Sequence, residues 1–143
     1  MKADVKGQGG QHWLYSEKVQ DHFFNPRNLF TTDEEAEKFE EEADGIGEIG
    51  SPACGDVMRM YIKVKNNIVI DCKWKTFGCA SAIASTSMLS VMVIGKTVEE
   101  AKKITPRDIV EALHGLPPRK IHCSVLGDQA LRASIIDYEE KKL

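Results

Sequence analysis

The residues of this chain best suited to chemistry are four cysteines, at positions 54, 72, 79 and 123. Cys72 shares one face of an alternating segment with apolar residues, which predicts a buried, structural thiol. Cys54, Cys79 and Cys123 each lie where one predicted element gives way to the next. A helix that begins at Cys79 or Cys123 stabilises a thiolate there, the form of cysteine that binds metals and attacks sulfur.

The three junction cysteines are predicted to converge in space. Cys54 precedes the first strand of a predicted hairpin and Cys79 follows the second, so both lie at one end of the hairpin. If the last helix docks at that end, Asp56, His122 and Cys123 join them. Three thiolates, one imidazole and one carboxylate form a ligand set that suits an iron–sulfur cluster or zinc.

Other interpretations of these residues remain open. The cysteines are spaced singly, unlike the paired C-x-x-C knuckles of a zinc finger, but a closed zinc site is an alternative. A cysteine enzyme would pair Cys123 with His122, yet adjacent helical side chains point about 100° apart. Inert thiols and two disulfides are further alternatives, although no secretory signal favours disulfides. His12, His22 and His114 are expected to be surface or packing residues.

Length and composition indicate one globular domain. The chain has 143 residues, 42% hydrophobic and 29% charged, which excludes wholesale disorder. A net charge of −3 argues against a nucleic-acid or anionic-membrane partner. The longest apolar run, 82–95, is interrupted by Ser and Thr and is too short to cross a bilayer. We expect a flexible tail over 1–14, a domain over 15–143 and a cytoplasmic location, since residues 1–11 lack an apolar signal core.

One segment concentrates the negative charge. Residues 33–44 contain eight acids and one base, Lys38. Thr32 and Glu35 form a capping-box pattern that predicts a short helix. Its apolar residues, Ala36 and Phe39, are expected to bury little surface. The segment is interpreted either as a solvated helix face or as an electrostatic handle for a basic partner.

Alternation and turn residues predict the sheet. Residues 56–64 and 68–77 alternate between apolar and polar side chains, and Asn66-Asn67 suits a two-residue turn. Ile68, Ile70, Cys72 and Trp74 are expected to share one face. The glycines at 45, 47 and 50 predict irregular chain or an edge strand. The fold class is therefore α+β, a small antiparallel three-stranded meander with helices packed on one face.

Capping signals predict the helices. The first runs from Ser16 to about Phe24 and ends at Asn25-Pro26. The second half of the chain is predicted to be helical. A long helix covers 80–94 and stops at Gly95, and a capping box at Thr97 and Glu100 begins the next helix. A further helix starts at Thr105-Pro106 and ends at Gly115, and a last helix covers about 124–140.

Five motifs, in order along the chain, resemble the IscU/NifU N-terminal family of iron–sulfur cluster assembly scaffolds. The resemblance covers about residues 15–138. The chain departs from the family in a longer, more acidic stretch after Asn28, in Ala80 where glycine is frequent, and in Arg119 at a variable position. The motifs are Asn25-Pro26-Arg27-Asn28, Pro52-Ala53-Cys54-Gly55-Asp56, Lys75-Thr76-Phe77-Gly78-Cys79, Ser81-Ala82-Ile83-Ala84-Ser85 and Leu116-Pro117-Pro118-Arg119-Lys120-Ile121-His122-Cys123.

This resemblance implies a scaffold and carrier rather than an enzyme. It implies a transient [2Fe–2S] cluster built on Cys54, Cys79 and Cys123, completed by His122 or Asp56, and passed to apo-proteins. Cys123 is the implied persulfide acceptor. In the alternative interpretation as a structural or regulatory zinc protein, zinc could occupy the same ligands in isolated protein.

The resemblance also implies partners. Sulfur would come from a PLP-dependent cysteine desulfurase and electrons from a ferredoxin-type reductant. An Hsp70-type chaperone would recognise the segment with Leu116, Pro117, Pro118 and Lys120. Tyr15 matches a family tyrosine linked to a homodimer.

Overall fold

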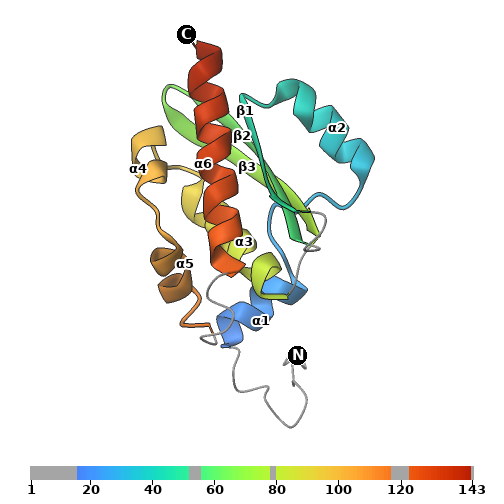
Figure 1. The fold of residues 1–143 in the computed structure, drawn as a ribbon, viewed down its shortest axis with the longest axis vertical. Helices are drawn as coiled ribbons and strands as arrows, with labels where there is room; N and C mark the ends of the chain where they lie inside the picture. Colours follow the sequence, from blue (N-terminus) through green and yellow to red (C-terminus); the bar gives the residue numbers. More distant parts are fainter. Residues whose placement is uncertain (1–15, 52–55, 78–79, 117–122, 143) are drawn as a thin grey trace.

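The computed structural model describes residues 16–51, 56–77, 80–116 and 123–142 (Figure 1). These form a three-stranded sheet and six helices in the described part of the chain. No helix among the described residues is long and apolar enough to cross a membrane. The elements are α1 Glu17–Phe24, α2 Asp33–Glu42, β1 Gly45–Ser51, β2 Asp56–Lys65, β3 Ile68–Phe77, α3 Ala80–Val93, α4 Val98–Lys102, α5 Pro106–Ala112 and α6 Cys123–Lys142.

The sheet is an antiparallel meander in the order β1-β2-β3, as predicted. The β2–β3 turn is made by Asn66 and Asn67, whose φ angles are +53° and +65°. Asparagine tolerates this left-handed region better than most residues, and two such residues give a turn that matches the twist of the strands. The glycine-rich segment that precedes β2 forms the edge strand β1.

A register shift near the turn corrects one sequence prediction. Ile68 and Ile70 were expected on the same face as Cys72 and Trp74, but they are 39% and 50% exposed, whereas Val69 is fully buried. Lys63 pairs with Asp71 and Val64 pairs with Val69, so Ile70 is an extra residue on β3. Such a bulge reverses the faces of all residues beyond it.

The main core lies between one face of the sheet and the helices α3 and α6. Figure 1 shows these two helices on the same side of the sheet. Each large apolar side chain buried there contributes about 1.5–3 kcal/mol relative to exposure. The core includes Met58, Met60, Ile62, Val69, Cys72 and Trp74 from the sheet and Leu89, Val93, Leu131 and Ile135 from the two helices.

The opposite face of the sheet carries α2, alone among the described helices (Figure 1). Phe39 packs with Phe30 and Tyr61, with ring centroids 5.5 and 6.2 Å away. The expectation that Ala36 and Phe39 bury little was wrong, because their side chains are only 2% and 8% exposed. The prediction used local composition alone, whereas the burial comes from the aromatic ring that β2 presents.

Capping residues begin the helices α1, α4 and α5 at the predicted positions, whereas α5 ends at Ala112, before the predicted stop at Gly115. The Ser16 hydroxyl accepts from the Val19 N–H at the start of α1. Complete capping boxes begin α4 at Thr97 and α5 at Thr105. Gly95 follows α3 with φ +95°, a conformation that glycine adopts without steric cost.

A buried histidine joins α1 to α3 and makes stability depend on pH. His22 Nδ1 lies 2.7 Å from Ser87 Oγ, and the residue is 6% exposed. Burial and the nearby Arg27 cation lower the His22 pKa below its usual value of about 6.5. Of the two roles predicted for His22, surface or packing residue, the structure shows packing.

The free energy of unfolding is therefore expected to fall as the pH drops below about 6.5. Below that pH, His22 binds a proton in the unfolded chain more readily than in the folded one, which favours unfolding. The contribution of neutral His22 to stability is therefore complete above about pH 6.5 and is lost as the pH falls to the pKa of His22 in the folded protein. Urea unfolding at pH 7.5 and 5.5 measures the loss, and His22→Gln is the control, since it keeps a polar group near Ser87 without titrating. Equal losses in both proteins would contradict the prediction.

Candidate metal centre

Two of the five predicted site residues lie at the ends of described elements. Asp56 is the first residue of β2 and Cys123 is the first residue of α6. Cys54, Cys79 and His122 lie outside the described residues. Asp56, Cys123 and the described residues that flank the other three positions show where the chain enters and leaves the elements around the predicted site.

Strand register brings the flanks of Cys54 and Cys79 to one end of the sheet. Ser51 pairs with Asp56 across β1 and β2, and Val57 pairs with Phe77 across β2 and β3. Neighbouring strands are about 4.8 Å apart. The chain therefore leaves β1 and β3, and enters β2, at the same end of the sheet.

Glycines on β1 place α6 against the same strand. A Cβ on Gly47 would overlap the carbonyl oxygen of Ala130 and lie 2.7 Å from Ala133 Cβ, and one on Gly45 would lie 3.0 Å from Tyr138 Cβ. Only glycine lets helix and strand backbones approach this closely. The contacts move toward the start of α6 as β1 advances, so the two elements are antiparallel.

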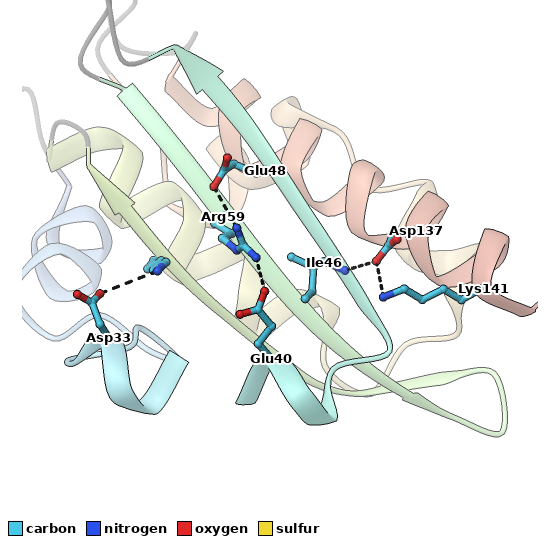
Figure 2. A network of polar contacts seen from close by, with 8 residues as sticks. Asp33, Glu40, Ile46, Glu48, Arg59, Asp137 and Lys141 are labelled. Carbon is cyan, nitrogen blue, oxygen red and sulfur yellow. Dashed lines mark hydrogen bonds and ion pairs between the residues drawn. The ribbon is translucent and has the colours of Figure 1, made fainter. Parts of the chain in front are cut away.

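The first turn of α6 therefore lies at the Ser51 end of the sheet, near the start of α3 (Figure 1). Gly127 of α6 faces Thr86 of α3, where an added Cβ would lie 2.9 Å from Thr86 Oγ1. Asp137 also fixes α6 to β1, because its carboxylate accepts from the Ile46 N–H at 2.9 Å and pairs with Lys141 (Figure 2).

These placements agree with the convergence expected from the sequence. The chain positions next to Cys54 and Cys79, and Cys123 itself, meet at one end of the molecule. α3 begins at Ala80 and α6 at Cys123, so both helix N-termini occupy this end. Helix N-termini carry free N–H groups and a partial positive charge, which favour thiolates. The distances between the three thiols stay a prediction.

The fourth cysteine is excluded from the site by its burial. Cys72 of β3 is a free thiol that is fully buried in the main core. Burial, together with the nearby Asp71 carboxylate, raises the pKa of the Cys72 thiol far above its usual value. It therefore remains protonated and is a poor ligand or nucleophile. The structural role predicted for Cys72 is confirmed.

The structure explains the Asn25–Asn28 motif as a support for α3. The Arg27 N–H donates to Ser87 Oγ at 2.8 Å, and Asn28 Nδ2 donates to Ser90 Oγ at 2.9 Å. The indole of Trp74 donates to the Arg27 carbonyl at 2.8 Å. No role was predicted for these two serines. The available signal was the repeated hydroxyl side chains within a helix that is rich in apolar residues, since buried hydroxyls require partners.

Leu116 is the one described residue of the predicted chaperone-binding segment, and its side chain packs into the core with 8% exposed. Tyr15, Pro117, Pro118 and Lys120 lie outside the described residues. Among the residues that the structure describes, no group of three or more His, Cys, Asp or Glu side chains is arranged to hold a metal ion.

Comparison with known proteins identifies the family. The profile of the NifU-like N terminal domain matches residues 14–143. The chain belongs to the NifU-like N-terminal domain family. It is 53% identical over 128 residues to iron-sulfur cluster assembly scaffold protein IscU 1 of Archaeoglobus fulgidus, a match that covers 90% of this chain and 78% of that protein.

Other relatives agree with membership of the NifU-like family. The chain is 49% identical to iron-sulfur cluster assembly scaffold protein IscU of Escherichia coli K12, across 90% of this chain and 96% of that protein. Among solved structures, the N-terminal part of a NifU-like protein from Brucella abortus superposes with a TM-score of 0.67 at 20% identity. That match covers 90% of this chain and 96% of the other and shows that the fold is shared.

Proposed function

We propose that this chain assembles a transient [2Fe–2S] cluster on Cys54, Cys79 and Cys123 and transfers it to apo-proteins in the cytoplasm. Asp56 or His122 would supply the fourth ligand. The observation that carries the proposal is the meeting of β1, β2, β3, α3 and α6 at one end of the fold, within a family whose relatives are named as iron–sulfur cluster scaffolds.

Sulfur delivery is proposed to begin at Cys123. Its thiolate attacks the terminal sulfur of a persulfide on a PLP-dependent cysteine desulfurase. The sulfur–sulfur bond of that persulfide breaks, the desulfurase thiolate leaves, and Cys123 carries the persulfide. Two electrons from a ferredoxin-type reductant then release the terminal sulfur as sulfide. The position of Cys123 at the start of α6 favours the thiolate that this step requires.

Cluster release is proposed to depend on the mixed ligand set. Thiolates are soft ligands that suit iron–sulfur clusters, whereas a carboxylate oxygen is hard and exchanges more readily. Asp56, at the start of β2, would provide that weaker bond. A chaperone of the Hsp70 type acting on the 116–120 segment, and a homodimer involving Tyr15, remain proposals drawn from the family resemblance.

Anaerobic reconstitution tests the proposal. The full chain, incubated with iron, cysteine and a desulfurase, is expected to develop the visible charge-transfer bands of a [2Fe–2S] cluster and to lose them when apo-ferredoxin is added. The alternative, a zinc protein that uses the same ligands, predicts tight zinc binding with no visible bands. A colourless chain that retains zinc during reconstitution would contradict cluster assembly.

Replacing Cys123 with serine is expected to abolish persulfide transfer to this chain. A hydroxyl cannot replace the thiolate nucleophile at neutral pH. Mass spectrometry after incubation with desulfurase and cysteine should show an adduct of about 32 Da (one sulfur atom) on the native chain and none on the variant. Cys72→Ala is the control and should keep the full adduct, because Cys72 is buried. A full adduct on Cys123→Ser would assign the acceptor role to another thiol.

A further inference from the structure

The outer face of the sheet, opposite the main core, carries a cluster of cations: Arg59, Lys63, Lys73 and Lys75. Arg59 and Lys75 are direct cross-strand partners. Like charges in this position destabilise a sheet unless an anion lies between or beside them. Two acids of the strands share this face, Glu48 opposite Arg59 and Asp71 opposite Lys63. The four cations outnumber them, so the face keeps an excess of positive charge that favours a negatively charged occupant, although the net charge of the chain is −3.

The acidic helix α2 occupies this face. Glu40 pairs with Arg59 at 2.6 Å, Glu42 pairs with Lys63 at 2.9 Å, and Asp33 lies 3.9 Å from Lys75. Figure 2 shows Arg59 between Glu40 of α2 and Glu48 of β1. The basic cluster therefore recognises carboxylates carried on a helix.

The attachment of α2 is weak for a helix of this length. Ala36 and Phe39 are the only two buried residues of α2. The carboxylates that pair with the sheet are exposed, at 44% for Glu40, 66% for Glu42 and 92% for Asp33. Exposed ion pairs contribute little to stability and are screened by salt. A second acidic segment can therefore compete with α2.

The face is also incompletely filled. A pocket of about 630 Å³ lies between the chain that precedes α2 and the strands, and Leu29, Thr32, Glu48, Arg59 and Lys75 are among its lining residues. Arg59 Nε is buried and has no hydrogen-bond partner in the described part of the chain. Lys75, whose contact with Asp33 is 3.9 Å long, is the lining cation that α2 leaves incompletely paired.

We propose that the outer face of the sheet binds an acidic helical segment of another protein, which displaces α2. The choice of a polypeptide follows from the present occupant, since α2 inserts Phe39 beside Phe30 and Tyr61 while its carboxylates pair with the cations. The face is therefore complementary to a helix that carries several carboxylates and one apolar ring. This inference is independent of the proposed cluster assembly, because it uses no residue of the metal centre.

The test uses a fluorescent peptide with the sequence of residues 32–43, TDEEAEKFEEEA, added to the full chain. Glu40→Gln/Glu42→Gln weakens the attachment of α2 and leaves the basic face intact. We expect this variant to bind the peptide at least roughly tenfold more tightly than the native chain, and more weakly as NaCl rises from about 0.05 to 0.5 M.

Two cation variants in the same background locate the binding. Lys73→Gln/Lys75→Gln should reduce affinity roughly tenfold or more. Lys102→Gln/Lys103→Gln removes the same charge elsewhere, where Lys102 pairs with Glu139, and should leave affinity unchanged. Four results would each overturn the proposal. The first two are no peptide binding and equal binding by the native chain and Glu40→Gln/Glu42→Gln. The other two are an equal loss of affinity in both cation variants and tighter binding of a single-stranded RNA of similar charge.

Discussion

Replacing Gly47 with alanine is expected to lower the free energy of unfolding by about 2–4 kcal/mol. An alanine Cβ would overlap the Ala130 carbonyl and the Ser134 N–H of α6. These are backbone atoms, so no side-chain rotation relieves the overlap and α6 must move away from β1. In a strand without such a neighbour, replacing glycine with alanine raises the free energy of unfolding by about 0.5–1 kcal/mol. A decrease for Gly47→Ala would therefore show that α6 lies against this position.

Gly95→Ala provides the comparison for Gly47→Ala. Gly95 has φ +95° and nothing within 4 Å of an added Cβ, so its substitution tests backbone strain without a clash. We expect a cost of about 1–2 kcal/mol there. Urea unfolding measures both variants. A Gly47→Ala protein as stable as the native chain would show that α6 does not rest on β1 as the structure describes.

The same substitution is also expected to reduce cluster loading. α6 begins with Cys123 at the Ser51 end of the sheet, so in the proposed site a shift of the helix would move Cys123 away from the segments with Cys54 and Cys79. At a temperature where Gly47→Ala remains folded, the visible absorbance after reconstitution should fall below that of Gly95→Ala. Equal absorbance in the two variants would contradict the positioning role of the β1 glycines.

Replacing Asp56 with alanine is expected to slow cluster transfer roughly tenfold, which corresponds to about 1.4 kcal/mol in the barrier to release. In the proposed site, the carboxylate oxygen of Asp56 would be the hard, exchangeable donor beside soft thiolates. Without it, the cluster loses its most labile contact, and the loaded protein should be easier to isolate. Transfer is measured by the decay of visible absorbance with apo-ferredoxin present.

Glu111→Ala is the matched control for Asp56→Ala. Glu111 is an exposed carboxylate of α5 whose described ion pair is with the exposed Arg107. Its removal should leave the transfer rate unchanged. Transfer by Asp56→Ala at the native rate would refute the labilising role, while cluster formation in that variant would still support the three cysteines as ligands.

Much of the candidate site was predictable because its placement follows from local signals. Alternation defined β2 and β3, and Asn66-Asn67 marked the turn between them, so the flanks of Cys54 and Cys79 had to share one end of a hairpin. Burial of Cys72 followed from the same alternation. Local signals did not predict that α6 docks at that end. The physical reason is the close approach of α6 to the glycines of β1.

The sequence by itself determined the helix caps, the hairpin, the buried thiol and the order of the junction cysteines, because each depends on residues within a few positions of one another. Only the tertiary structure decided the bulge at Ile70, the burial of Phe39 against Tyr61 and the close approach of α6 to β1. These features arise from contacts between residues far apart in the chain, and composition or periodicity within one segment carries no information about its distant neighbours.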